Sequence, residues 1–296
     1  MLIPFSILMF ILGAAFGSFL CCEARRLRER ELRRRPPGPR SVCLHCHHQL
    51  KWYDNLPILS WLILRGKCRY CHRKIGLAEF LAELGLATAF LALGLHFYLT
   101  ASVLPSVNGW AFPPIHPLNW AIFAITLLLT LSLGFLAIYD GAYGELPALP
   151  LTISIICAII IVILRQEASL FVIQSPSSSS TPLLFHQLRM FAAHPWSPTF
   201  ASLLAAALLG GLYLVLYLAS HGRWVGDGDW LLATAIGLAL GSPWLALIAL
   251  LVANLTATLA YPLIKTPGSH QLHFGPFLVA AFVIVATFSD FFISVI

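Results

Sequence analysis

Residues 225–230, Val-Gly-Asp-Gly-Asp-Trp, carry the carboxylates of this sequence that most favour chemistry. Asp227 and Asp229 stand beside long apolar runs, in a chain with only 10% charged residues. An aspartate in the middle of a membrane helix costs about 2.5–3.5 kcal/mol, so acids near spans are functional candidates by default. Two glycines within three residues allow unusual backbone dihedrals and let another segment approach closely. The alternative is an ordinary turn between two spans, where Gly and Asp are common.

Four cysteines form a second candidate site. Cys43 and Cys46 make one C-x2-C pair, Cys68 and Cys71 make another, and 21 residues separate the two pairs. Four thiolates at this spacing are typical of a tetrahedral structural zinc site, which leaves no open coordination position for catalysis. The alternative is four reduced thiols packed in a small loop, because disulfides are not expected in the cytosol.

The composition is that of a polytopic membrane protein, since 59% of the 296 residues are hydrophobic. Fourteen of the 18 Lys and Arg residues lie between Arg25 and Lys74. A basic block beside the first span marks the cytoplasmic side of the membrane. The block is short and flanked by spans, so it predicts no nucleic-acid partner. Its Arg25–Arg35 part is suited to a weak attraction to anionic lipid headgroups.

Apolar runs predict an all-α fold, a polytopic membrane helix bundle of about eight transmembrane helices with a small cytosolic cysteine module. The expected spans are residues 1–20, 77–99, 119–139, 148–164, 201–219, 230–240, 244–264 and 274–296. As a helix, residues 230–240 cover only about 17 Å of a hydrocarbon core about 30 Å thick, so a short, broken or re-entrant span is expected there. Residues 165–200 are expected to form a long polar loop. Residues 36–39, Pro-Pro-Gly-Pro, are expected to end a charged helical extension of the first span.

This arrangement gives three regions. Residues 1–22 are the first transmembrane helix, residues 23–76 are a cytosolic basic region with the zinc module, and residues 77–296 are the transmembrane core. Asp140, at the end of the third span, and Asp229, after the fifth, are then expected on the cytosolic face. This topology places 16 positive residues inside and two outside, which agrees with the positive-inside rule.

Longer motifs carry a resemblance to a known family. They are Arg40-Ser-Val-Cys43-Leu-His-Cys46, Leu50-Lys-Trp-Tyr-Asp-Asn-Leu-Pro-Ile-Leu-Ser-Trp61 and Leu64-Arg-Gly-Lys-Cys68-Arg-Tyr-Cys71. Gly17-Ser18-Phe19-Leu20 looks like the first span of that family, and Phe274-Gly275-Pro276-Phe277 looks like the start of its last span. The sequence thus resembles the bacterial type IV prepilin peptidases, or prepilin leader peptidase/N-methyltransferases, which are similar to other G-x-G-D intramembrane aspartyl proteases.

The resemblance implies two catalytic aspartates. They are Asp140, six residues before a Leu-Pro pair, and Asp229, which closes G-x-G-D with Gly226 and Gly228 in the active-site loop. Two carboxylates brought close together cannot both ionise cheaply, so they share a proton. The ionised one takes a proton from water, and the protonated one donates to the scissile carbonyl oxygen. No metal ion is required at this site.

Several positions depart from the family pattern. Ala148 stands where an acid usually follows Leu-Pro, Leu231 where a basic residue is usual, and Asp227 where G-x-G-D normally has no charge. Residues 76–78, Gly-Leu-Ala, replace a stretch usually rich in Ser or Tyr. The side chain of Asp227 would point to the other side of an extended backbone from Asp229, so we expect it to be solvated rather than a third active-site acid.

The resemblance also implies substrates, a cofactor and a location. The substrate would be a prepilin or pseudopilin, with a short basic leader that ends in Gly before an apolar helix. Cleavage would take place at the cytosolic face of the bacterial inner membrane. S-adenosylmethionine would methylate the new N-terminal amine, although the sequence has no glycine-rich motif for that cofactor. Glu83 matches a family glutamate and is a candidate contact for the substrate, with a buried structural hydrogen bond as the alternative.

Three other functions stay open from the sequence. One is a peptidase without methylation, and another is a non-catalytic relative that binds pilins, which the departures keep in view. The third is a transporter with buried acids as proton sites. The transporter gains nothing from the cysteine pairs, and no inverted repeat is visible in the sequence. The lipid bilayer is the expected environment, and no oligomeric state is predicted.

Overall fold

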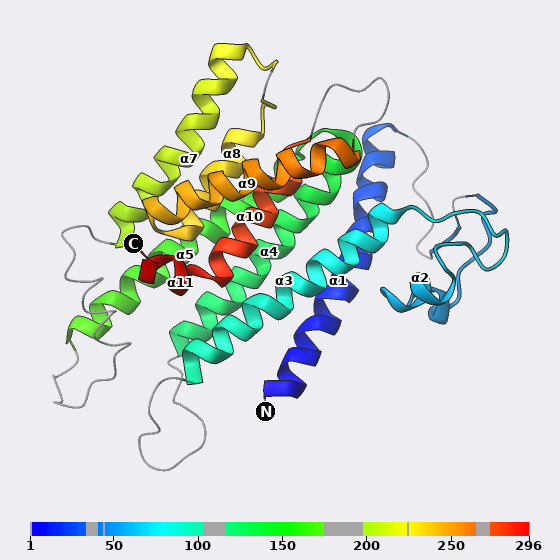
Figure 1. The fold of residues 1–296 in the computed structure, drawn as a ribbon, viewed down its shortest axis with the longest axis horizontal. Helices are drawn as coiled ribbons and strands as arrows, with labels where there is room; N and C mark the ends of the chain where they lie inside the picture. Colours follow the sequence, from blue (N-terminus) through cyan, green and yellow to red (C-terminus); the bar gives the residue numbers. More distant parts are fainter. Residues whose placement is uncertain are drawn as a thin grey trace. The chain divides into compact units, whose positions relative to one another are not determined.

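The computed structural model describes residues 2–33, 41–43, 45–102, 117–174, 198–223, 225–264 and 273–295. Within these ranges the regular elements are all helices, which confirms the predicted all-α class (Figure 1). The chain forms two compact units, Met1–Gly94 and Leu95–Ile296. The expected three regions and the side of the membrane on which each lies stay predictions.

The described helices divide between the units within α3, after Gly94. The first unit contains α1 (Leu2–Glu31), the 3-10 helix η1 (Trp52–Asn55), α2 (Leu59–Ile63) and the larger, N-terminal part of α3 (Leu77–Ser102). The second contains the rest of α3, α4 (Pro117–Tyr143), α5 (Ala148–Gln174), α7 (Pro198–Ser220), α8 (Asp229–Leu240), α9 (Pro243–Ile264), α10 (Gly275–Thr287) and α11 (Ser289–Val295).

Glycines allow α1 and α3 to pack closely in the first unit. A Cβ atom added to Gly13 would lie 2.4 Å from the Leu86 carbonyl oxygen, and one added to Gly17 would lie 2.7 Å from the Glu83 Cα atom. Small residues of this kind are typical of closely approaching membrane helices. Because α1 runs without a break to Glu31, the expected charged extension of the first span is confirmed to that residue. The expected proline stop lies outside the described residues.

The second unit is organised around α8, a helix of 12 residues. Nine of these residues are buried, on every side of the helix. The helix contacts α5, α7, α9 and α10, and Figure 1 shows α7 and α9 beside it. A helix that is apolar all round is stable only when it is surrounded by other apolar material. The expected short apolar helix at 230–240 is therefore confirmed.

The C-terminal end of α8 is closed by two different groups. Gly241 has a left-handed φ of 72°, and its N–H donates to the Gly237 carbonyl oxygen at 3.2 Å. Arg165 of α5 donates from Nη1 to the Ala239 carbonyl oxygen at 2.6 Å. A glycine in this conformation and a cation at the end are both favourable for the unpaired carbonyls of a helix C-terminus.

Two expected segments are corrected. The prediction that a polar loop begins at residue 165 is wrong, because α5 continues to Gln174. Arg165 is part of this helix and donates to the Ala239 carbonyl oxygen of α8. Residues 175–197 of that loop lie outside the described residues. The span expected at 274–296 is wrong as a single helix, because Phe288, with φ −102° and ψ 21°, ends α10 before α11 begins.

The number of spans follows from these lengths. Among the described residues, six helices are long and apolar enough to cross a membrane: α1, α3, α4, α5, α7 and α9. The apolar helices α8 and α10 are shorter. Six of the about eight expected spans are therefore helices of spanning length among the described residues, and the crossing of the membrane by α8 and α10 stays a prediction.

The packing of α7 against α8 predicts different effects at two adjacent glycines. A Cβ on Gly210 would lie 2.0 Å from Thr234 Oγ1 and 3.1 Å from the Thr234 Cα atom, whereas a Cβ on Gly211 would meet nothing within 4 Å. Overpacking costs about 1–3 kcal/mol, so Gly210→Ala should lower the thermal unfolding temperature in detergent. Gly211→Ala should leave it unchanged or raise it, because Ala favours a helix by about 1 kcal/mol over Gly. Equal unfolding temperatures for the two variants would contradict this packing.

Candidate active site and metal centre

Asp229 begins α8, and the loop before it holds its carboxylate. The Gly226 N–H donates to Asp229 Oδ2 at 2.8 Å. The residue is only 9% exposed. A carboxylate in the first turn of a helix is also favoured by the unpaired N–H groups and the positive end of the helix dipole. Asp227, two residues earlier, is exposed, in agreement with the expectation that it is solvated.

Asp140 lies in the last turn of α4 and is held in a similar way by a distant segment. The Gly275 N–H, at the start of α10, donates to Asp140 Oδ2 at 3.0 Å. A Cβ on Gly275 would lie 2.7 Å from that same oxygen, so only glycine lets the backbone approach so closely. Asp140 is 6% exposed. The sequence presents Gly275 only as part of a motif, because its contact depends on how α10 packs against α4.

The two aspartates, 89 positions apart in the chain, interact electrostatically. Their carboxylates lie within electrostatic range of each other. The loops that carry them also meet, because a Cβ on Gly228 would lie 2.8 Å from the Leu146 Cβ atom. Glycine at 228 thus lets the G-x-G-D loop approach the turn that follows α4. Two carboxylates in such an arrangement favour a single shared proton.

Two further side chains of this site have no sequence signal of their own. His273 Nδ1 lies 3.8 Å from Asp140 Oδ1. Tyr213 of α7 is buried, interacts electrostatically with Asp229, and has its ring centroid 5.8 Å from that of Phe274. The only available hint was that His273 directly precedes the motif at residues 274–277.

In the first unit the four predicted cysteines converge. The Sγ atoms of Cys43, Cys46, Cys68 and Cys71 all lie within 4.8 Å of one another. A tetrahedral zinc site with Zn–S bonds of about 2.3 Å requires sulfurs about 3.8 Å apart. The Cys43 and Cys71 sulfurs are 3.8 Å apart. The cluster can therefore bind a metal ion such as zinc, as its spacing predicts.

The two cysteine pairs have the same backbone arrangement. The Cys43 N–H donates to the His48 carbonyl oxygen at 3.0 Å, and the Cys68 N–H donates to that of Arg73 at 2.9 Å. The residue after each pair, His47 or His72, has a left-handed φ of 54° or 55°. An isolated bridge closes each turn, at residues 42 and 49 and at residues 67 and 74. The chain thus supplies the metal ligands from two copies of one turn.

Backbone donors also favour the thiolate at Cys43. Burial by itself raises the pKa of this thiol, but N–H groups of Cys46 and His45 and hydrogen bonds from neighbouring thiols lower it to about 7. The thiolate is the form that binds metal ions.

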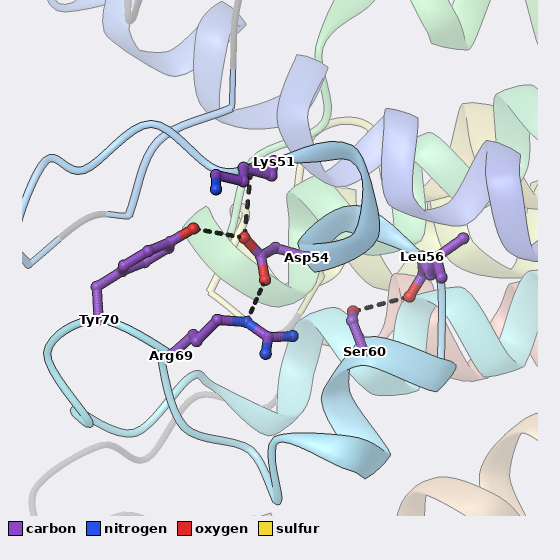
Figure 2. A network of polar contacts seen from close by, with 6 residues as sticks. All are labelled: Lys51, Asp54, Leu56, Ser60, Arg69 and Tyr70. Atoms are coloured by element: carbon purple, nitrogen blue, oxygen red, sulfur yellow. Dashed lines mark hydrogen bonds and ion pairs between the residues drawn. The ribbon is translucent and has the colours of Figure 1, made fainter.

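Asp54 ties the second cysteine pair to the rest of the module (Figure 2). Its carboxylate accepts hydrogen bonds from Arg69 Nε at 2.7 Å, the Tyr70 hydroxyl at 3.0 Å and the Lys51 N–H at 3.2 Å. Burial by itself raises the pKa of Asp54, but these hydrogen bonds lower it overall. Arg69 and Tyr70 are the two residues between Cys68 and Cys71, so Asp54 holds the turn that presents both sulfurs.

Glu83 has a contact within the first unit. Its Oε2 accepts a hydrogen bond from the Ile58 N–H at 2.7 Å. Ile58 has a φ of 63°, which is an outlier for a β-branched residue. This hydrogen bond gives Glu83 a structural task, while its contact with a substrate stays a prediction.

A cavity of about 670 Å³ lies among α1, the cysteine module and the beginning of α3. Its volume is in the range of small-molecule sites. Both acidic and basic side chains line it, among them Arg25, Arg73, Lys74, Asp54, Glu79 and Glu83. Trp61 also lines it, and in the described part of the chain its indole N–H has no hydrogen-bond acceptor.

Comparison with known proteins finds relatives over both parts of the chain. The family model described as Bacterial Peptidase A24 N-terminal domain matches residues 11–97. A Myxococcus xanthus protein named prepilin leader peptidase/N-methyltransferase is 38% identical over 103 residues, which are 35% of this chain and 30% of that protein. Proteins of the same name from Aeromonas hydrophila and Burkholderia pseudomallei are 27% and 29% identical over 82% of this chain. The chain is thus similar to proteins named prepilin leader peptidase/N-methyltransferase.

The chain spans only part of the length of these relatives. The matched segments cover about 30% of the Myxococcus protein and of two other relatives that match over a short segment. They cover 69% and 65% of the Aeromonas and Burkholderia proteins. No solved structure matches the chain. The four cysteines and Glu83 lie within the residues matched by the family model, whereas Asp140 and Asp229 lie beyond them.

The cysteine cluster predicts one tightly held metal ion per chain. Elemental analysis of the purified protein should find about one zinc per chain, and Cys68→Ser should abolish it, because a structural site needs all four ligands. Cys157→Ser, at a buried cysteine of α5 outside the cluster, should retain the metal ion. A stable wild-type protein that contains no metal ion would contradict the prediction.

Proposed function

We propose that this protein is an intramembrane aspartyl peptidase that removes the leader from prepilins or pseudopilins. The supporting observation is a pair of buried carboxylates, Asp140 and Asp229, which reach one site from α4 and α8. The names of the related proteins support the substrate class. Catalysis at the cytosolic face of the bacterial inner membrane follows from the basic block beside the first span.

The mechanism uses the shared proton of the two aspartates. The ionised carboxylate takes a proton from a water molecule, whose oxygen attacks the scissile carbonyl carbon, while the protonated carboxyl donates to the carbonyl oxygen. As the peptide bond breaks, the pair returns a proton to the leaving amine. Gly226 and Gly275 each engage an Oδ2 atom, so the Oδ1 atoms would face water and substrate, with His273 Nδ1 3.8 Å from that of Asp140. The pair titrates as a unit, so the two roles belong to both residues together.

The position of the two aspartates suits a substrate that is itself a membrane helix. Asp140 is in the last turn of α4, and Asp229 is in the first turn of α8. A prepilin has a short polar leader before an apolar helix. When this helix lies in the bilayer, the junction with the leader comes to the membrane surface, at the level where long apolar helices end.

The dyad predicts a clear difference between neighbouring aspartates. Asp140→Asn and Asp229→Asn should each reduce leader cleavage by about 100-fold or more, because general acid–base catalysis contributes about 10²–10⁴-fold. Asp227→Asn, a matched exposed control in the same loop, should retain cleavage. The assay uses the purified full chain in lipid with a model prepilin. Normal cleavage by either dyad variant would overturn the assignment, and no cleavage by the wild type would favour a pilin-binding protein.

We also propose that the first unit holds the methyl donor of a second activity, N-methylation of the processed pilin. The cavity of about 670 Å³ is the observation that favours it. Its basic side chains would hold the carboxylate of the donor, and its acidic side chains would hold the amine and the ribose hydroxyls. Trp61 and Phe80, whose rings are stacked on each other, would lie against the base. S-adenosylmethionine supplies an electrophilic methyl group to the new terminal amine. The metal cluster supports the wall of the cavity, because Cys43 and Cys68 line it.

The methyl-donor site predicts a selective effect of one tryptophan. Trp61→Ala should weaken the binding of S-adenosylmethionine, measured by calorimetry on the full chain, by about tenfold, because stacking on an aromatic ring is worth about 1–3 kcal/mol per base. Trp52→Ala should leave binding unchanged, since Trp52 is 77% exposed and does not line the cavity. Leader cleavage without donor binding, and without a methyl group on the product by mass spectrometry, would leave the peptidase-only alternative.

A further inference from the structure

We propose that His273 is a third titratable member of the aspartate site, and that its imidazolium maintains the working charge of the pair at acid pH. The inference rests on the proposed peptidase function and adds a positioning residue to it. The two aspartates alone would lose this charge as protons are added, whereas a neighbouring cation opposes the loss.

The imidazole of His273 lies near Asp140 Oδ1, the carboxylate oxygen that the Gly275 N–H does not engage. Gly275 occupies Oδ2 with its N–H, and His273 Nδ1 lies 3.8 Å from the other oxygen, Oδ1. His273 also interacts electrostatically with Asp229. One basic side chain therefore acts on both carboxylates.

The turn that ends α4 leaves room for this ring. Gly144 has a left-handed φ of 71°, and its N–H donates to the Asp140 carbonyl oxygen at 2.8 Å. A Cβ on Gly144 would lie 2.6 Å from His273 Cε1 and 3.0 Å from its Nδ1. Both the backbone conformation and the close approach require glycine here. The helix end that positions Asp140 thus also seats the imidazole.

The surroundings of His273 make it the link between the aspartates and solvent. Its side chain is 41% exposed, against 8% for that of Asp140. The titratable groups shown to interact with it are Asp140 on α4 and Asp229 on α8, and Tyr213 on α7 interacts with Asp229 in turn. Both partners of His273 are acids, and a tyrosine is neutral at acid pH. Among these groups, His273 is the one that can carry a positive charge.

The sign of the pH effect follows from the charges. A cation within about 4–6 Å favours the ionised form of a carboxylate. An aspartyl pair works with one carboxylate ionised, and the acid limb of its activity profile marks the loss of that charge. A protonated imidazole beside the pair therefore opposes the loss of that charge. Removing His273 should therefore reduce cleavage on the acid side and leave it unchanged above neutral pH.

The test compares pH profiles of leader cleavage for the full chain in lipid. His273→Gln and His273→Asn should both move the acid limb to higher pH by about one pH unit. His96→Gln is a matched control, because His96 Nδ1 lies 3.9 Å from Asp290 Oδ2, a comparable pair away from the dyad. Its profile should superimpose on that of the wild type. Superimposable profiles for His273→Gln and wild type would overturn the proposal. If only His273→Asn kept the wild-type profile, the proposal would also fail. An amide can replace a hydrogen bond of the imidazole but not its charge, so such a result would show that a hydrogen bond is sufficient.

A second measurement does not depend on cleavage. Carbodiimides label protonated carboxyl groups, so peptide mass spectrometry can follow the labelling of Asp140 against pH. In His273→Gln this labelling should begin at higher pH than in the wild type. If the wild type cleaves no prepilin but the labelling still shifts, the proposed function fails and the charge coupling stands. If labelling is the same in both proteins, the coupling fails whatever the activity.

Discussion

Keeping two carboxylates buried side by side is the constraint on which the second unit depends. A buried carboxylate is costly unless it is hydrogen bonded, and two of them also repel each other when both are ionised. The chain meets the first cost with backbone donors, Gly226 for Asp229 and Gly275 for Asp140. Both donors are glycines, and Gly275 could not carry a Cβ so near the Asp140 carboxylate. The remaining repulsion is the property that the proposed mechanism uses, because two neighbouring carboxylates favour one shared proton.

The position of Asp229 in turn depends on α8, which is short and almost wholly buried. Its first residue carries one of the two buried carboxylates, and its last carbonyls are paired by Arg165 and Gly241. A helix that ends inside the bundle must satisfy its terminal backbone groups there, because neither lipid nor a continuing helix can do so. Close packing on α7, allowed by Gly210 and Gly237, holds the body of the helix between these two ends.

The cysteine module solves a different problem. It has little apolar interior of its own, since large side chains such as Trp52 and Ile63 are exposed. Small units of this kind need cross-links or metal ions to hold their chain. Here two copies of one turn bring four sulfurs together, and Asp54 fixes the second turn through Arg69 and Tyr70. The module thereby supplies a firm wall to the cavity in the first unit.

By itself, the sequence determined the helical membrane class, the two cysteine turns, the resemblance to prepilin peptidases, and the aspartates worth examining. These features are local, because a hydrophobic run or a ligand spacing can be recognised within one segment, whatever packs against it in the fold. Only the tertiary structure decided that Gly275 and His273 meet Asp140, that Arg165 closes α8, and that a helix break falls at Phe288. Each contact joins segments far apart in the chain, or depends on a neighbouring helix. Such contacts are selected by packing and by the need to pair buried polar groups, and these have no periodicity that a single segment can reveal.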